Sequence, residues 1–259
     1  MQKISPVSGW HWLQQGWALF LRQPLILSGL FACNILTISL LNLLPVLGPI
    51  LLVMIVPTLN MSLMNACVRI ANGEKVDFEV WRNTFRSPAF PVLCRLGLLY
   101  GLANVVALLL VNWIDHGVMM EVLNGKTKID PQGKDLSKIF PGLGMLLLFM
   151  LPAIMANWFA PLLISWKSMP LFKSLFFSFF AVWRALLAFI VLALSATGLM
   201  FGIAFICGLI IAITGPALGG LLLVPVMMTF CTVLYCSAYP AYIQIFGAEQ
   251  GGGVPTAKI

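Results

Sequence analysis

The sequence predicts an all-α integral membrane protein with six transmembrane helices, and three observations support this. Hydrophobic residues make up 61% of the chain and charged residues only 9%. Because a soluble domain is about half apolar and about a quarter charged, this chain has too little polar surface to coat a water-soluble globule. Six charge-free apolar runs are long enough to cross a bilayer. None shows the alternation of apolar and polar residues that is typical of a membrane barrel strand.

The six apolar runs are expected to be helices, because backbone groups in lipid must be hydrogen-bonded within their own segment. A helix needs about 20 apolar residues to cross about 30 Å of hydrocarbon. The runs that meet this requirement are 24–44, 46–68, 96–114, 141–166, 185–213 and 216–246. Gly-Pro steps in the turns after the first and fifth runs predict tight hairpins.

The distribution of lysine and arginine predicts the orientation of these spans. With six spans, both termini and the loops 69–95 and 167–184 share one side, which holds eleven of the fifteen basic residues. The other side holds four lysines in the loop 115–140, offset by four acidic residues. We therefore expect both termini to lie in the cytoplasm. We interpret the outer-loop charges as a solvated face. Asn124-Gly125 can end a short helix or form a hairpin turn, and we favour the short helix.

Both ends of the chain have a distinctive composition. The first twenty residues are amphipathic and contain no short apolar core with a cleavage site, so no signal peptide is expected. The last residues, 248–259, are rich in glycine, and we expect a flexible cytoplasmic tail there. The transmembrane domain is therefore expected to cover residues 1–247 as a single unit.

A short pattern recurs three times, in which an aromatic residue stands five positions before an arginine. The three pairs are Trp17 with Arg22, Trp81 with Arg86, and Phe179 with Arg184. Apolar residues at spacings of three, four and seven around each pair predict amphipathic helices. We expect these helices to lie at the inner membrane surface, with aromatic rings at headgroup depth and arginines facing anionic phosphates.

Each of these amphipathic helices precedes an apolar hairpin, which indicates three tandem units. The units would cover about 4–70, 76–166 and 168–246, and they would share one orientation because each crosses the membrane twice. The second span of each unit carries a central proline that breaks the helical hydrogen-bond ladder. These prolines are Pro57, Pro152 and Pro225. The alternative is that prolines and interfacial aromatic residues simply recur in multi-span proteins.

Small residues four positions apart occur in the first span of each unit and predict close packing of helix backbones. The pairs are Ser28 with Ala32, Gly97 with Gly101, and Gly198 with Gly202. We interpret them as packing within the chain, and formation of a homo-oligomer is the alternative.

The chain offers few groups for catalysis or metal binding. Its two histidines, His11 and His116, lie at opposite membrane surfaces, and no acidic residue lies within an expected span. The six cysteines lack zinc-ligand spacing, so we interpret them as buried apolar side chains. We therefore expect no enzyme activity, no cofactor and no metal. The basic residues are dispersed rather than clustered, which argues against binding to nucleic acid.

Uncharged polar residues follow the three central prolines by three to five positions. They are Asn60, Asn157 and Thr229. If the units are real repeats, these side chains converge at similar depth, where broken helices commonly form a binding site. The absence of ionisable residues there argues against proton-coupled transport. The simpler interpretation is hydrogen bonding between helices, at about 0.6–2 kcal/mol each.

Three stretches resemble a family of uncharacterised bacterial inner-membrane proteins with six predicted helices. They are the Gly-Trp-x-Trp start SGWHWLQQGWALFLRQP, the stretch PVLGPILLVMIVPTLNMSLMNACVRIANGEKV, and WFAPLLISWKSMPLFKSLFFSFFAVWRA. The most specific part is the Trp-Phe-Ala-Pro motif at residues 158–161. The resemblance covers nearly the whole chain except the tail. It implies a location and a topology, and it transfers no catalytic or ligand-binding residue.

Two functional hypotheses follow, and a membrane enzyme that acts through its outer loop is a third and weaker one. In the first, a non-enzymatic inner membrane protein acts through contacts with anionic lipid headgroups or a membrane protein partner. In the second, a small permease or channel carries a neutral or amphiphilic solute past the central polar residues.

Overall fold

The computed structural model describes residues 4–45, 47–116, 120 and 136–247. Over these residues the regular elements are all helices, and six helical segments are long and apolar enough to cross a membrane. The segments are Pro24–Asn42, Leu47–Ala71, Phe90–Ile114, Phe140–Lys167, Leu186–Ile213 and Leu223–Phe246. The predicted fold class is confirmed: the protein is an all-α integral membrane protein.

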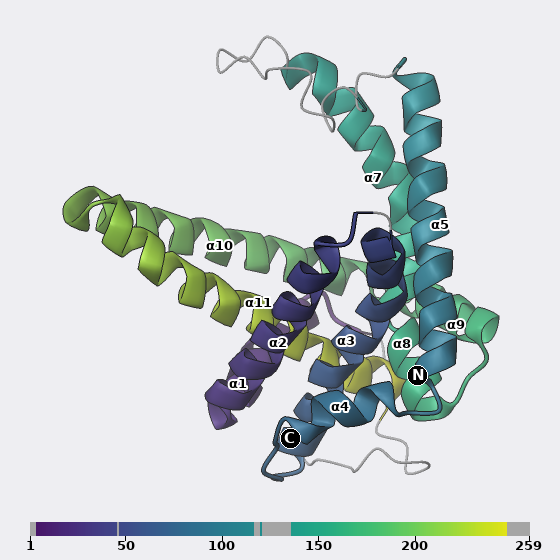
Figure 1. Ribbon diagram of the computed structural model, residues 1–259, viewed down its shortest axis with the longest axis horizontal. Coiled ribbons are helices and arrows are strands. Elements are labelled where there is room, and N and C mark those ends of the chain that lie inside the picture. Colours follow the sequence, from purple (N-terminus) through teal and green to yellow (C-terminus); the bar gives the residue numbers. More distant parts are fainter. Residues whose placement is uncertain (1–3, 46, 117–119, 121–135, 248–259) are drawn as a thin grey trace.

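The long helices form three hairpins, and Figure 1 shows them diverging from a common base. The first hairpin comprises α2 (Pro24–Asn42) and α3 (Leu47–Ala71), and the second comprises α5 (Phe90–Ile114), α7 (Leu136–Trp158) and α8 (Ala160–Lys167). The third hairpin comprises α10 (Leu186–Thr214) and α11 (Pro216–Phe246). A short helix precedes each one: α1 (Ser8–Arg22), α4 (Glu79–Phe85) and α9 (Leu171–Arg184). The chain thus forms three helix-plus-hairpin segments, α1–α3, α4–α8 and α9–α11.

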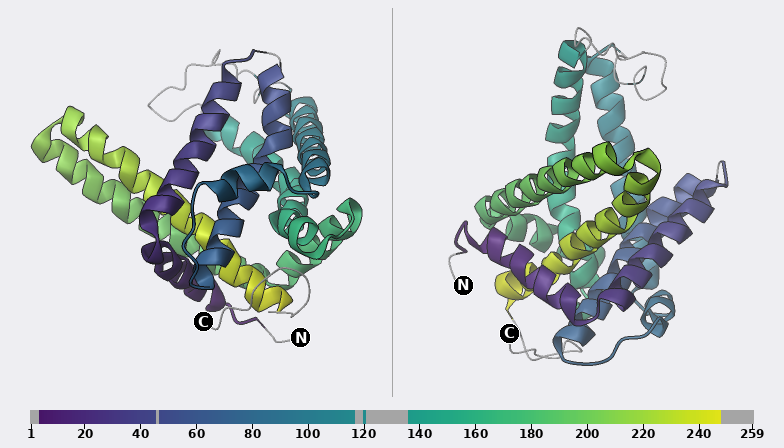
Figure 2. Two further views of the ribbon diagram at one scale, coloured as in Figure 1. Left: turned by 60° about the horizontal axis from the view of Figure 1, so that its bottom comes forward. Right: turned by 90° about the vertical axis from the view of Figure 1, so that its left-hand side faces the viewer.

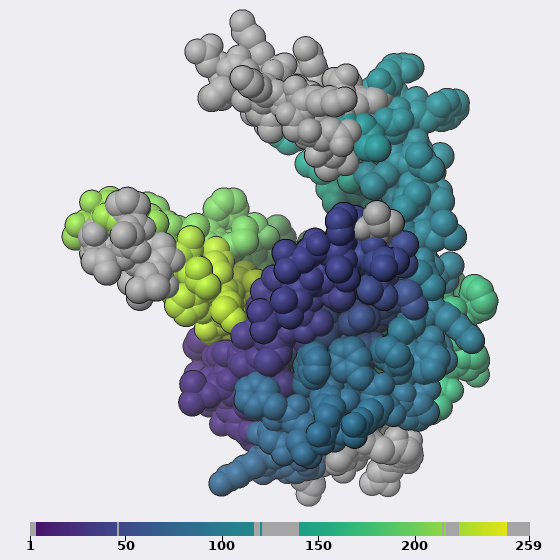
Figure 3. Space-filling view, viewed as in Figure 1, coloured from purple at the N-terminus to yellow at the C-terminus, as the bar shows by residue number. Residues whose placement is uncertain are grey.

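The short helices α1 and α4 and the C-terminal end of α11 lie at the base, the end of the molecule from which the three hairpins diverge (Figure 2). The outer ends of α5 and α7 lie at the opposite end of the molecule (Figure 2). The hydrophobic core also lies at the base, where fully buried side chains such as Trp12, Leu63 and Phe159 belong to one cluster. Further out, the α10–α11 hairpin stands apart from the α5–α7 hairpin (Figure 3). Only 6% of the α10 span is buried, so its surface is available to lipid.

Three tryptophan indoles join the segments through side-chain amides. In each pair the indole Nε1–H donates a hydrogen bond to an amide oxygen of a helix in a different segment. The pairs are Trp12 with Gln244, Trp81 with Asn34, and Trp166 with Asn65. Hydrogen bonding between helices therefore accounts for these three intramembrane amides.

Helices α3 and α5 approach each other closely at a glycine. A Cβ atom on Gly97 would overlap the carbonyl oxygen of Val53, which is the carbonyl to which Pro57 cannot donate a helical hydrogen bond. The sequence therefore predicted close packing correctly here. The prediction of close packing within the chain is wrong for Gly198 and Gly202. No atom of the described structure lies within 4 Å of where their Cβ atoms would stand.

The central prolines are not helix breaks, which corrects the expectation from the sequence. Helices α3, α7 and α11 continue through Pro57, Pro152 and Pro225. The fourth span is instead interrupted at Phe159, between α7 and α8, so the segment 141–166 is not one continuous helix. Neighbouring groups can satisfy the backbone around a proline in a transmembrane helix, and a proline alone therefore does not end one.

The interruption at Phe159 is stabilised by a side chain from α9. The hydroxyl oxygen of Ser178 accepts a hydrogen bond from the Phe159 N–H at 2.9 Å and donates one to the Met155 carbonyl at 2.9 Å. The hydroxyl thus replaces the helical bond that would join these two groups. Pro161 follows in the first turn of α8. The expected short helix near Asn124 and the tail 248–259 lie outside the described residues.

Candidate intramembrane binding site

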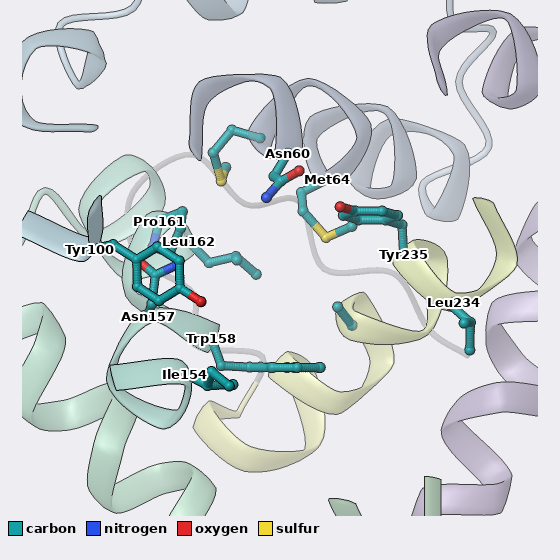
Figure 4. A pocket seen from close by; sticks show the side chains of 12 residues that line it. Asn60, Met64, Tyr100, Ile154, Asn157, Trp158, Pro161, Leu162, Leu234 and Tyr235 are labelled. Carbon is teal, nitrogen blue, oxygen red and sulfur yellow. The ribbon is translucent and has the colours of Figure 1, made fainter. Parts of the chain in front are cut away.

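A cavity of about 340 Å³ lies where α3, α5, α7, α8 and α11 meet. The second long helix of each hairpin contributes to its wall, so the cavity lies between all three segments. Figure 4 shows the twelve residues that line it. None of these twelve carries a charge or an imidazole. The site therefore offers uncharged hydrogen-bonding groups within an apolar wall.

The polar groups of the cavity come from four helices. Figure 4 shows the side chains of Asn60, Tyr100 and Tyr235 converging from α3, α5 and α11. Asn157 adds a carboxamide from the last turn of α7. Its Oδ1 atom is buried and has no hydrogen-bond partner within the described part of the chain. A buried polar atom without a partner is unusual in a folded protein, and it is often explained by a missing ligand, ion or water.

The break between α7 and α8 positions this side of the cavity. Asn157 and Trp158 are the last two residues of α7, and Pro161 on the other side of the break also lines the cavity. Because Pro161 has no N–H, it cannot donate to the Asn157 carbonyl. The Trp158 ring packs edge-on against Phe189 of α10, with 5.3 Å between ring centroids. The break thus fixes both an amide and an aromatic wall.

The rest of the wall is apolar and partly open. Met61, Met64 and Leu162 are buried, with exposed fractions of 0%, 3% and 4%, whereas Trp158 is 42% exposed. A smaller cavity of about 170 Å³ lies beside the first, and it shares Tyr100 and Asn157 while its other lining residues are all apolar. The polar groups of the cavity are therefore set within an apolar and partly exposed wall.

The structure brings together two of the three predicted polar residues. Asn60 and Asn157 line the same cavity. Thr229 lies elsewhere, with Pro225, in an apolar groove of about 820 Å³ between α1, α10 and α11. Tyr235 is the polar residue of α11 that lines the cavity instead. The signal that could have identified it, and Tyr100 as well, is a tyrosine near the middle of a span, where a hydroxyl lies at membrane depth.

Helix α1 has three faces rather than two. One face is buried against α10 and α11 and includes Trp12, Leu13 and Phe20. A second is apolar and exposed, and a third is polar and exposed. The exposed apolar residues are Trp10, Trp17 and Leu21, and the polar ones are His11, Gln14, Gln15 and Arg22. The predicted anchor Trp17 is thus 47% exposed, while Trp12 packs within the protein.

The arginines and tryptophan of the first two pairs have different surroundings. Arg22 is exposed, and its Nη1 donates a hydrogen bond to the Ala71 carbonyl at the end of α3, at 3.3 Å. Arg86 is also exposed. Trp81 is half-buried and donates its indole N–H to Asn34 at 3.0 Å. Trp81 therefore joins helices, and its indole N–H does not point to the headgroup layer.

Helix α9 carries an aromatic surface. Its buried face consists of small residues and packs against α7 and α8. Its exposed aromatic residues are Phe172, Phe176, Phe177, Phe180 and Trp183. The predicted anchor Phe179 is half-buried and stacks on Trp183 at a centroid distance of 6.1 Å. Lys173 and Arg184 are exposed on the same helix.

The described residues contain no group of three or more metal-ligating side chains. They do contain one close pair of thiols. The sulfur atoms of Cys67 in α3 and Cys236 in α11 are 3.4 Å apart, and both residues are fully buried.

Comparison with known proteins shows one extended similarity. A probable inner membrane protein of Burkholderia thailandensis is 31% identical over 258 residues, which cover 96% of this chain and 95% of that protein. No family model and no solved structure matches the chain. The similarity extends over nearly the whole of both chains and is not confined to one segment.

Proposed function

Because the chain belongs to the same family as this Burkholderia thailandensis protein, it is a multi-pass inner membrane protein, and we propose that it acts without catalysis, through contacts with lipids or partner proteins. In this proposal both termini lie in the cytoplasm, and the short helices contact anionic headgroups of the inner leaflet. The observation that carries the proposal is the exposed aromatic surface of α9, with its two basic residues.

The α9 surface is suited to a lipid interface. Ser174, Ser178 and Ala181 are small and buried, so the helix packs closely through that face and turns its phenylalanines outward. Phe172 and Phe176 are 75% and 61% exposed. Aromatic rings favour the headgroup boundary, and each basic residue near an anionic surface contributes about 1 kcal/mol of binding. A water-soluble surface would not retain so many exposed rings.

The lipid contact can be tested by removing the arginines. Replacing Arg22, Arg86 and Arg184 with Gln should lower the ratio of anionic to zwitterionic lipid that co-purifies with the protein, measured by mass spectrometry. Arg86→Gln alone is the cleaner variant, because Arg22 also bonds to the backbone of α3. The matched control replaces Lys126, Lys128 and Lys134 with Gln, which removes three charges from the opposite loop. An equal loss in both proteins, or no loss, contradicts the proposal.

The topology can be tested separately. A reporter tag at either terminus should be accessible only after the inner membrane is permeabilised. This expectation follows from the six spans, which put eleven of the fifteen basic residues on the same side as the termini. A tag that is accessible from the periplasm of intact cells would overturn the orientation and the inner-leaflet contacts together.

A second candidate function is a small permease or channel for a neutral or amphiphilic solute. The cavity with its unpartnered Asn157 oxygen specifically favours it. Cysteines introduced at Asn60 or Asn157, in a chain without its native cysteines, should react with small thiol reagents from the aqueous phase. Leu148→Cys is the control and should stay unreacted, because Leu148 is 66% exposed on an apolar, lipid-facing surface of α7. Complete protection of both positions would remove the solute path.

A further inference from the structure

We infer that the cavity between α3, α5, α7, α8 and α11 binds a neutral amphiphile whose polar end is a hydroxyl or a carboxamide. The inference uses the site of the second candidate function, but it requires binding only and not transport. It follows from the hydrogen-bonding groups, the absence of charge and the shape of the wall.

The hydrogen-bonding groups select a ligand that both donates and accepts. Asn60, Asn157, Tyr100 and Tyr235 all line the cavity, and each carries a carboxamide or a hydroxyl that can donate and accept. The buried Asn157 Oδ1 has no partner within the described structure. A ligand hydroxyl or carboxamide can both donate to and accept from these four lining groups, which is the match that such a ligand provides.

The absence of charge excludes an ionic head. None of the twelve described residues that line the cavity is an Asp, Glu, Lys, Arg or His. A carboxylate, phosphate or ammonium group would lose its hydration there without gaining a counter-ion, which is strongly unfavourable. A phospholipid headgroup is therefore disfavoured, whereas a neutral alcohol or amide is not.

The apolar wall accommodates the body of such a ligand. Met61 and Met64 supply flexible, polarizable side chains that adapt to different shapes, and Trp158 supplies a partly exposed aromatic face. The volume of about 340 Å³ falls within the usual range for small-molecule sites, about 300–1,000 Å³. The partly exposed rings of Trp158 and Tyr235, at 42% and 37%, mark the side from which the ligand enters.

The test is photolabelling of the purified full-length chain in detergent. The probe is a long-chain primary alcohol that carries a diazirine and an alkyne, and labelled peptides are identified by mass spectrometry. Labelling should saturate, should be competed by unlabelled decanol, and should fall on cavity residues such as Met64 and Trp158. The matching long-chain carboxylate probe should not label the cavity saturably.

Variants make the test specific. Asn157→Leu should weaken saturable labelling about tenfold, as expected for loss of one hydrogen bond within a ligand site. Tyr100→Phe removes a single oxygen atom and should also weaken labelling, even if the first variant does not fold. Thr229→Val changes a residue of the separate groove and should leave labelling unchanged.

The outcomes separate this inference from the permease hypothesis. Saturable labelling that the Asn157 and Tyr100 variants reduce supports the inference, even if thiols at Asn60 and Asn157 are fully protected and the solute path is lost. Labelling that never saturates, that the carboxylate probe matches, or that all variants retain overturns the inference, even if those thiols react from water.

Discussion

Ser178 shows how one buried hydroxyl controls the shape of the candidate site. Its two hydrogen bonds replace one helical bond and let the chain change direction at Phe159. This turn directs Asn157 and Trp158 into the cavity. Pro161 stands two residues after Phe159 in the sequence, but Ser178 lies nineteen residues beyond Phe159. No local pattern connects the two residues, so the position of the break could not be predicted.

Replacing Ser178 with alanine should destabilise the protein by about 1–3 kcal/mol, because the Phe159 N–H would be buried without a partner. Thermal unfolding in detergent measures this effect. Ser174→Ala is the control, since Ser174 is equally buried but bonds only to a carbonyl of its own helix, Leu171. Equal shifts for the two variants would show that the Ser178 bridge has no special role.

The polar residues of the site were partly predictable for a related reason. Asn60 and Asn157 each follow a central proline. Their positions after these prolines predicted that they lie at a similar depth in the membrane. Depth does not specify the direction in which a side chain points. Thr229 faces α1 and α10, while Tyr235, six residues later, faces the cavity. The rotation of α11 about its axis depends on tertiary packing, and hydropathy along the chain does not reveal it.

Among the elements, the contact between α3 and α5 combines a proline with a glycine. Pro57 leaves the Val53 carbonyl without its helical donor, and Gly97 allows the α5 backbone to approach that oxygen. Small residues permit such close approach between membrane helices, where van der Waals packing is a main source of association. The proline of one helix and the glycine of the next therefore act as a pair.

Gly97→Ala should separate α3 from α5 and destabilise the protein by about 1–3 kcal/mol, the usual cost of overpacking. Gly198→Ala is the matched control in α10, where a Cβ atom meets nothing within 4 Å. It should leave the thermal unfolding temperature unchanged or raise it, because alanine is the better helix former. A larger loss for the α10 variant would mean that its glycines pack against something, such as a second copy of the chain.

The connection between α4 and α2 depends on the Trp81–Asn34 hydrogen bond. A double-mutant cycle with Trp81→Phe and Asn34→Leu should give a coupling free energy of about 0.6–2 kcal/mol, in the range for polar contacts between membrane helices. Unfolding of the purified unmodified protein, the two single variants and the double variant provides the four values. Additive effects would indicate that Trp81 is held by its ring contacts alone, such as the one with Phe85 at 4.8 Å.

At the scale of the whole molecule, the six spans were predictable because lipid requires each segment to satisfy its own backbone. The way the hairpins pack was not. Indole–amide bonds and the buried cluster join the three segments near their base, while the outer part of the α10–α11 hairpin stands apart (Figure 3). These contacts link residues that are far apart in the sequence, so neither composition nor hydropathy predicts them.

The close thiols provide a direct test of how the first and third segments pack. In a chain that retains only Cys67 and Cys236, a membrane-permeant oxidant such as iodine should produce an intramolecular disulfide. The 3.4 Å separation must shorten to about 2.05 Å, which small side-chain movements can achieve. Mass spectrometry of the digested protein should then identify a peptide from α3 linked to one from α11.

The control chain retains Cys94 and Cys207 instead, on α5 and α10, which are also buried. Within the part of the chain that the structure describes, neither thiol has a sulfur atom as a hydrogen-bond partner, so this pair should stay reduced under the same treatment. Efficient cross-linking of the control would mean that disulfide formation does not report the described contacts. Failure of Cys67 to link to Cys236 would mean that α3 and α11 do not meet as described. The cavity would then lose one of its walls, because Asn60 and Tyr235 lie on these two helices.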